Sequence, residues 1–159
     1  MRLTIAAVGR LKDGPERELF DRYWVRCGGL GKTLALAPLK LAEMPESRAT
    51  AAGTRKSDEA KRLLASAAGS TIIALDEGGR AMTSAAFATY MRRERDAGTA
   101  GLAFLIGGAD GHGDAVLASA AVRLSLGAMT LPHGLARVIL AEQLYRAATI
   151  IAGHPYHRA

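Results

Sequence analysis

Hydrophobic residues occur along the chain in short uninterrupted runs that alternate with longer segments of helical spacing. Runs at 3–8, 71–75, 102–106 and 122–126 predict strands. The run at 71–75 shows no polar alternation, which is typical of a strand covered on both faces of a parallel sheet. A less regular run at 33–41 contains Pro38 and predicts an edge strand.

Segments of helical spacing separate these runs. Residues 15–26 place Phe20, Tyr23 and Trp24 on one face, and the glycines at 28, 29 and 31 predict the end of that helix. Residues 42–57 are polar and basic and predict a loop, whose basic side chains could meet phosphate. Ser57 is expected to cap the next helix, and Thr83 or Ser84 the one after it. Two further helices are expected at 114–120 and 135–151, so the alternation predicts an α/β fold with a largely parallel sheet.

Length and charge narrow the class of protein. The 159 residues, 49% of them hydrophobic, predict one domain spanning 1–159. A formal net charge of +6 favours a polyanionic partner, first of all RNA or DNA. Cys27 is the only cysteine, so no internal disulfide can form. No apolar stretch has the length of a signal peptide or a membrane span, and we expect a soluble, cytoplasmic protein with no membrane partner.

The ends of three predicted strands carry the candidate chemistry. Ligands of open α/β sheets bind at the carboxyl ends of strands, here 75–76, 106–108 and 126–131. At Gly107 and Gly108 the missing side chains would let a ligand approach the backbone. Neither a dinucleotide G-x-G-x-x-G motif nor a phosphate-binding G-x-x-x-x-G-K-[ST] motif occurs, which disfavours NAD and ATP sites. The four histidines have no metal-ligand spacing, so we expect no metal: His112, His133, His154 and His157.

Each of these features also has a purely structural interpretation. Gly107 could belong to a tight turn, Pro132 could begin a helix, and Met129 could fill the core. Arg146 follows Glu142 by four residues, a spacing that stabilises a helix without any function. These alternatives stay open at the level of sequence.

The last helix segment and the tail that follows it suggest interactions with other molecules. Residues 135–151 are apolar in almost every direction apart from a polar stripe, so we expect the helix to be covered on both sides in a homodimer, and Leu144→Glu to disfavour association. The stripe consists of Glu142, Gln143, Arg146 and Thr149. The chain then ends in His-Pro-Tyr-His-Arg, which is not a core-forming sequence. Tyr156 could stack on a base, and Arg158 could bind phosphate.

Three motifs together identify a family. LIGGADG, LSLGAMTLPHGLARVILAEQLYRA and the terminal HPYHR resemble the small bacterial 23S ribosomal RNA pseudouridine N3-methyltransferases of the SPOUT superfamily. The resemblance is strongest and most specific over 102–158, and the opening MRLTIAAVG fits it as well. The segment 41–56 matches only in being variable and basic.

The resemblance implies a cofactor, a topology and an assembly. Family members use S-adenosylmethionine, contain a C-terminal deep trefoil knot, and form homodimers in which the knot of one protomer faces the tail of the other. The matching cofactor-binding positions are Leu75, Gly107, Leu126, Gly127, Ala128, Met129, Thr130 and Leu131. The family often has Pro-Glu where this chain has Ala109-Asp110, which leaves open whether Asp110 reaches the cofactor ammonium.

The expected reaction is methyl transfer from S-adenosylmethionine to N3 of a pseudouridine in large-subunit ribosomal RNA. N3 is an imide nitrogen, so the site must accept its proton or stabilise the anion. His133 or His157 could accept the proton, and Arg146 or Arg158 could stabilise charge, with Tyr156 beside them in the tail. The small chain favours an assembled ribosome, as the large subunit or the 70S particle, over naked RNA. The alternative is a non-catalytic RNA- or ribosome-binding protein on the same fold, while the missing phosphate motifs disfavour a nucleotide enzyme of unrelated chemistry.

Overall fold

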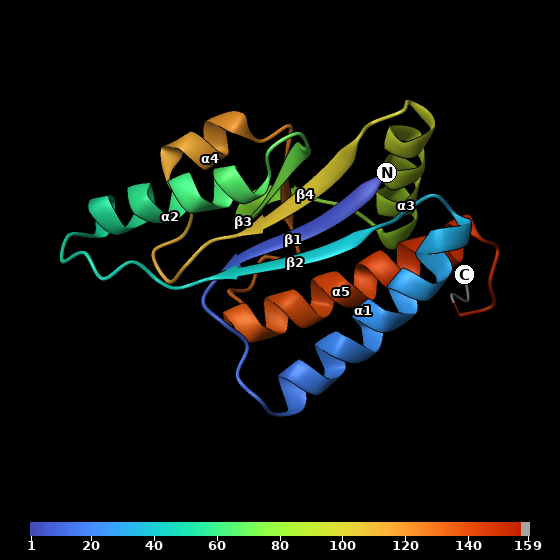
Figure 1. Ribbon diagram of the computed structural model, residues 1–159, viewed down its shortest axis with the longest axis horizontal. Helices are drawn as coiled ribbons and strands as arrows, with labels where there is room; N and C mark the ends of the chain where they lie inside the picture. Colours follow the sequence, from blue (N-terminus) through green and yellow to red (C-terminus); the bar gives the residue numbers. More distant parts are fainter. Residues whose placement is uncertain (157–159) are drawn as a thin grey trace.

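Five parallel strands form the central layer of the protein, whose computed structural model describes residues 1–156 (Figure 1). Their spatial order is β2-β1-β4-β3-β5. The expected α/β fold with a parallel sheet is confirmed. The strands are β1 (Arg2–Val8), β2 (Leu39–Met44), β3 (Thr71–Ala81), β4 (Gly101–Ile106) and β5 (Val122–Ser125).

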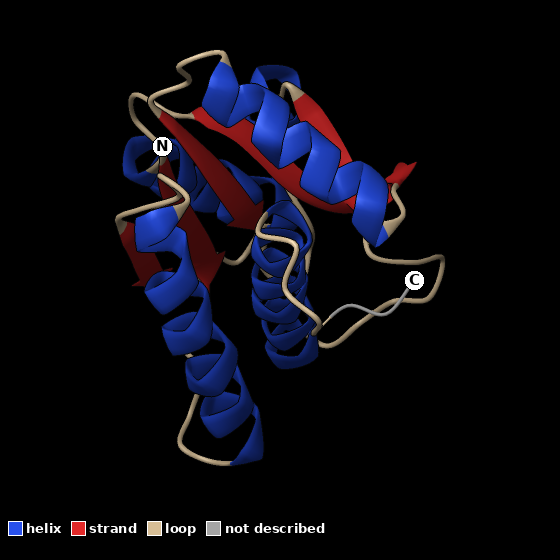
Figure 2. Ribbon diagram, turned by 90° about the vertical axis from the view of Figure 1, so that its right-hand side faces the viewer, coloured by secondary structure: helices blue, strands red, loops and turns tan. Residues whose placement is uncertain are grey.

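Helices cover both faces of this sheet (Figure 2). One face carries α1 (Pro15–Thr33), α3 (Ser84–Asp96) and α5 (His133–Ile151), and the other carries α2 (Ala52–Ser66) and α4 (Asp114–Ser119). Along β1, Leu3 and Ile5 pack in the core with α1, α3 and α5, whereas Ala6 and Val8 pack with α2. Both faces are therefore buried, which explains why the strand runs show no polar alternation.

The prediction that glycines end the first helix is wrong. α1 continues through Gly28, Gly29 and Gly31 to Thr33. An interior glycine costs only about 1 kcal/mol of helix stability, and packing of α1 along α5 outweighs that cost. Gly31 is required where it stands, because an added Cβ would lie 2.6 Å from the Leu36 carbonyl oxygen.

The segment predicted as a loop at 42–57 is also partly wrong. β2 runs to Met44 and α2 begins at Ala52, so Ser57 lies inside the helix and does not cap it. The edge position expected for β2 is confirmed, with Pro38 just before the strand. By contrast, Thr83 caps α3 as predicted, its Oγ1 accepting a hydrogen bond from the Ala86 amide at 3.1 Å.

The third strand is longer than its apolar run. β3 continues to Ala81, and Leu75 and Arg80 share Leu124 as their register partner in β5. The four residues between them therefore form an irregularity in the strand. Gly79 fits tightly here, since an added Cβ would lie 2.7 Å from the Arg123 backbone.

The last helix is covered within the chain to a greater extent than its composition predicts. α5 packs against α1 and α3, and the Leu144 side chain is fully buried in the core of the single protomer. Leu144→Glu would therefore place a charge in that core and unfold the chain, and the expectation that it tests association is wrong. The large hydrophobic side chains of α1 and α5 that stay exposed are those of Leu19, Val25 and Leu135.

Candidate functional site

The carboxyl ends of β3, β4 and β5 surround a cavity of about 480 Å³. In Figure 1 the arrowheads of β1, β2 and β4 point toward the side on which α5 begins, and β3 and β5 run parallel to them. Seven of the eight expected cofactor-binding residues line the cavity, and the eighth, Ala128, belongs to the same loop without lining it. The seven are Leu75, Gly107, Leu126, Gly127, Met129, Thr130 and Leu131.

Glycines let the chain pack closely on the β4 side of this cavity. An added Cβ on Gly107 would lie 3.0 Å from the Gly111 carbonyl carbon and 3.2 Å from the His112 amide nitrogen. On Gly108 it would lie 2.6 Å from a carboxylate oxygen of Glu59, a side chain that is itself buried. The interpretation of Gly107 as a tight turn is thus correct as far as it goes, and the same residue also lines the cavity.

The loop between β5 and α5 is fixed at both ends. Ser125 Oγ accepts a hydrogen bond from the Gly127 amide at 3.2 Å and lies 2.9 Å from the Gly127 carbonyl oxygen. Thr130 Oγ1 donates to Glu77 at 3.0 Å and so ties the loop to the irregular part of β3. Met129 between them is 82% exposed and cannot be core filling. The loop presents backbone and an apolar side chain to whatever enters the cavity.

Asp110 lines the cavity but already has a partner. Its carboxylate accepts hydrogen bonds from Arg55 Nε at 2.7 Å and Nη2 at 3.2 Å, and this bidentate contact lowers the pKa of Asp110. Arg55 also donates to the carbonyl oxygens of Ala49 at 3.1 Å and Thr50 at 2.7 Å. The shorter carboxylate of this chain is therefore engaged by α2, and Arg55 is not free for phosphate in this arrangement.

His112 is a lining residue that sequence reasoning did not select. Its Nε2 lies 3.0 Å from the Leu75 carbonyl oxygen, so Nε2 carries the proton and donates. Nδ1 is buried and has no hydrogen-bond partner among the described residues. Burial lowers the pKa of His112 and outweighs the opposite effects of the Leu75 and Leu105 backbone and of Asp76, while Lys56 lowers the pKa further.

This histidine predicts a loss of stability in mild acid. Because the pKa of His112 is lower in the folded chain, the unfolded chain takes up the proton first as the pH falls below the ordinary value of about 6.5. The free energy of unfolding should therefore decrease between pH 7.5 and 5.5. In His112→Gln, which has no titrating group but can still donate to Leu75, the decrease should be smaller. Urea unfolding at both pH values measures the difference, and parallel behaviour of the two proteins would contradict the assignment.

Of the predicted catalytic residues within the described part of the chain, His133 lies apart from Arg146 and Tyr156. His133 lines the cavity at the first turn of α5. Arg146 lies thirteen residues further along that helix, which corresponds to roughly 20 Å, and Tyr156 lies beyond its end. His157 and Arg158 lie outside the described residues.

Arg146 and Tyr156 form a compact cluster around Glu142. Glu142 Oε1 accepts hydrogen bonds from Arg146 Nη2 at 2.6 Å and from the Tyr156 hydroxyl at 3.1 Å. The Arg146 guanidinium lies over the Tyr156 ring, 5.2 Å from its centroid, and the Tyr145 ring packs against it at 4.7 Å. Burial, Tyr23 and Glu142 together raise the pKa of Tyr156 to about 12. With this pKa the Tyr156 phenol stays protonated near neutral pH, and the phenolate that could accept a proton is not available. Tyr156 is therefore a stacking and hydrogen-bonding group here.

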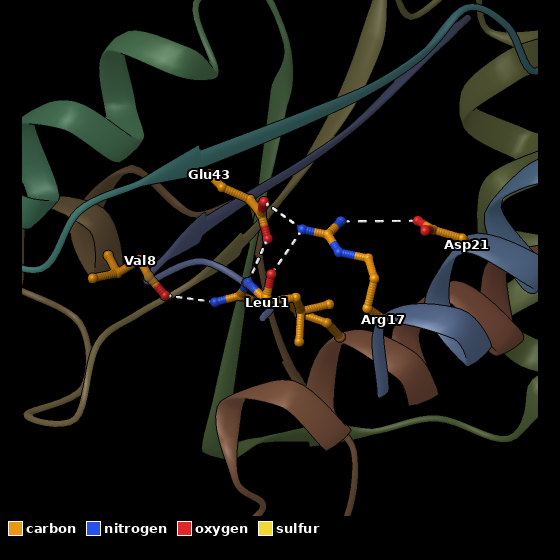
Figure 3. A network of polar contacts seen from close by, with 6 residues as sticks. Val8, Leu11, Arg17, Asp21 and Glu43 are labelled. Atoms are coloured by element: carbon orange, nitrogen blue, oxygen red, sulfur yellow. Dashed lines mark hydrogen bonds and ion pairs between the residues drawn. The ribbon is translucent and has the colours of Figure 1, made fainter. Parts of the chain in front are cut away.

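An ionic network around the buried Arg137, joining β2, α1 and α5, was also missed from sequence (Figure 3). Glu43 on β2 accepts from Arg137 Nη1 at 2.8 Å and from Arg17 Nη2 at 3.0 Å. Arg137 is 2% exposed, and its Nη2 donates to the Val8 carbonyl oxygen at 2.7 Å. The two arginines and the Leu11 amide hold the pKa of Glu43 below its ordinary value despite partial burial. The one sequence feature that could have indicated this network is an arginine, Arg137, among the apolar residues of α5.

Other classes of site find no support in the described part of the chain. Residues 1–156 contain no group of three His, Cys, Asp or Glu side chains placed to hold a metal ion. Over the same residues, none of the helices combines the length and hydrophobicity that crossing a membrane requires.

Comparison with known proteins shows which family the chain belongs to. A family model described as "Predicted SPOUT methyltransferase" matches residues 1–157. The chain is 53% identical over 160 residues to the Ribosomal RNA large subunit methyltransferase H of Xanthobacter autotrophicus, with 100% of each chain covered. It is 52% identical over 159 residues to the protein of the same name from a Methylobacterium species, with 99% of this chain and 98% of the relative covered.

The solved structures that match are less similar in sequence to this chain than these relatives are. The SpoU methyltransferase AviRb from Streptomyces viridochromogenes, in complex with the cofactor AdoMet, aligns with 96% of this chain and 60% of its own. At a TM-score of 0.41 and 12% identity, that likeness carries no argument about this chain. The full-length sequence matches are sufficient by themselves: the chain belongs to the SPOUT methyltransferase family.

Proposed function

We propose that the protein methylates N3 of a pseudouridine in 23S ribosomal RNA, with S-adenosylmethionine as the methyl donor. The observation that carries the proposal is the cavity itself, about 480 Å³ in volume, where the glycine-rich end of β4 faces the loop before α5. Relatives named for large-subunit ribosomal RNA methylation match the whole chain. The net charge of +6 suits an RNA substrate.

The lining residues fit S-adenosylmethionine. Leu75, Gly107 and the loop 126–131 would hold it through backbone groups and apolar side chains, which suits a ligand with an adenosine and a short aliphatic chain. When bound, it supplies a methyl group on a positively charged sulfur. Asp110 is paired with Arg55, so a contact with the cofactor ammonium would require one Asp110 oxygen to accept a second hydrogen bond, or Arg55 to move.

The proposed reaction also requires that the proton on N3 be removed. His133 borders the cavity and is our candidate proton acceptor in the protomer that holds the cofactor. His157 stays an equal candidate from the tail. Arg146 or Arg158 would stabilise the negative charge that deprotonation leaves on the base.

A homodimer would bring these groups together. Arg146 and Tyr156 lie at the opposite end of α5 from His133, so we propose that the tail cluster of one protomer completes the cavity of the other. The proposal has four further parts. The chain forms one domain over 1–159 with a C-terminal trefoil knot, and it acts in the cytoplasm on an assembled ribosome. These follow from the family resemblance and the proposed substrate.

The exposed apolar side chains of α1 and α5 predict where the dimer forms. Val25 is 73% exposed and Leu135 is 41% exposed, so a charge at either position leaves the protomer core intact. Val25→Glu and Leu135→Glu should each weaken association at least roughly tenfold by burying an unpaired charge in the interface. Sedimentation at several concentrations measures this, with Val25→Thr as the uncharged control. A wild-type monomer would contradict the proposed assembly.

Two measurements test the proposed function. Isothermal titration with S-adenosylmethionine separates an enzyme from a non-catalytic ribosome-binding protein on the same fold, which would show no cofactor binding. Transfer of labelled methyl groups to ribosomes then tests the substrate. Label in purified 23S RNA at a pseudouridine is the expected result, and label in another nucleotide would contradict the assigned specificity.

A further inference from the structure

A second cavity, of about 750 Å³, adjoins the first and has no role in the function proposed above. It lies at the carboxyl ends of β1 and β2, between the loop 9–14 and the segment 45–48. The first turns of α1 and α5 close its other sides, and His133 lines both cavities. β1 has β2 on one side and β4 on the other, so the two cavities flank the point where the strand order reverses, a usual ligand site in open α/β sheets.

The wall of this cavity is held in shape by the buried ionic network. The Leu11 amide donates to Glu43 Oε1 at 2.9 Å, and Arg17 Nη2 donates to the Leu11 carbonyl oxygen at 3.0 Å (Figure 3). Gly9 and Gly14, with φ of 81° and 141°, bend the loop at either end. Burying charges is costly, and apolar packing often stabilises a fold equally well. A network that fixes a glycine-bent loop therefore points to a required loop shape.

The cavity is rich in donors suited to phosphate. α1 and α5 both begin here without a side-chain cap, so amide groups and the positive ends of two 19-residue helices face the site. Arg137 lines it, and the buried Arg137 Nε–H has no acceptor within residues 1–156. Arg10, Lys12 and Arg48 are exposed and form no ion pair with any described residue.

Carboxylates in the same cavity offer acceptors. Asp13, Glu16 and Glu46 line it, with Glu16 against Gly134 and Glu46 close to Gly9. A site for a free polyanion alone would not need them. A strand of RNA presents phosphates to the cations and base N–H groups to the carboxylates, so the mixed lining fits a nucleotide within a strand better than an isolated anion.

We propose that this second cavity binds the RNA strand that carries the target base, with its phosphates at Arg10, Lys12 and Arg48 and the base directed toward His133, where the cavities meet. The inference rests on the proposed function and names the part of the surface that recognises its substrate. The competing occupant is the tail of a second copy of the chain.

The test compares the double variant Arg10→Ala/Lys12→Ala with Lys32→Ala/Arg92→Ala. The control removes the same charge from exposed residues that line neither cavity. With ribosomes as substrate, the first variant should raise KM roughly tenfold and lower the slope of log affinity against log salt by about 0.7 to 0.9 per lost phosphate contact. The affinity for S-adenosylmethionine and the unfolding midpoint should match the wild type.

Three results in these variants would overturn the inference. A KM equal to that of the control variant would remove RNA from this cavity, and so would a weaker affinity for S-adenosylmethionine that accounts for the whole defect. A shift from dimer to monomer with unchanged KM would assign the cavity to the second chain. Failure of the wild-type protein to methylate ribosomes would instead refute the proposed function, so the two failures are distinguishable.

Discussion

Gly107→Val is expected to bind S-adenosylmethionine roughly ten- to hundredfold more weakly than the wild type while keeping its fold. A Cβ at this position would lie within 3.2 Å of the backbone of Gly111 and His112, so the turn after β4 must move into the cavity or away from it. Valine adds two further methyl groups at this contact, so the displaced residues include Gly111 and His112, which line the cavity proposed for the cofactor. Isothermal titration measures the affinity, and circular dichroism checks the fold.

Gly53→Val provides a matched control. Gly53 lies in the first turn of α2, where an added Cβ would have no neighbour within 4 Å, and it does not line the cavity. The same chemical change there should leave the affinity for S-adenosylmethionine unaltered. Wild-type affinity in Gly107→Val, with an intact circular dichroism spectrum, would contradict the assignment of this cavity to the cofactor.

Deleting Pro155 to Ala159 should abolish methyl transfer to ribosomes and leave cofactor affinity within about twofold of the wild type. The deletion removes Tyr156 from its contacts with Arg146 and Glu142, at the end of α5 remote from the cavity of the same chain. Loss of one charge-stabilising group typically costs about 10²- to 10³-fold in rate. Tyr156→Phe keeps the ring over Arg146 and should retain most activity, which separates stacking from the hydroxyl contact.

Mixed dimers test whether two protomers share each site. A heterodimer of the tail deletion with Gly107→Val has one chain with an intact cavity and one with an intact tail. If the site is shared, one of its two sites works, and the rate should recover to about half that of the wild type. No recovery in purified heterodimers would count against a shared site, and full activity of the tail deletion alone would refute the role of the tail.

Local patterns were sufficient for much of the fold. The β4 run at 102–106 is buried on both faces, and an uninterrupted apolar run bounded by glycines is enough to predict such a strand. Thr83 caps α3 through a bond to its own first turn, which is a local interaction. The glycines at the end of β4 and the loop before α5 could be identified as cavity residues because carboxyl ends of parallel strands meet at one edge.

The features that sequence did not predict depend on distant contacts. α1 continues through three glycines because α5 packs along it. Leu144 is covered within the protomer by neighbours that periodicity cannot identify. Arg137 contacts Val8, a residue 129 positions earlier, so nothing near Arg137 in the sequence indicates its partner.

Mass spectrometry of 23S ribosomal RNA from cells with and without this gene tests the proposed reaction most directly. Nuclease fragments from wild-type cells should contain one pseudouridine that carries an additional methyl group, and fragmentation should place that methyl on N3. The same fragment from cells lacking the gene should contain the pseudouridine without the methyl, and plasmid-borne wild type, but not Gly107→Val, should restore it. An identical modification pattern in both strains would contradict the proposed function.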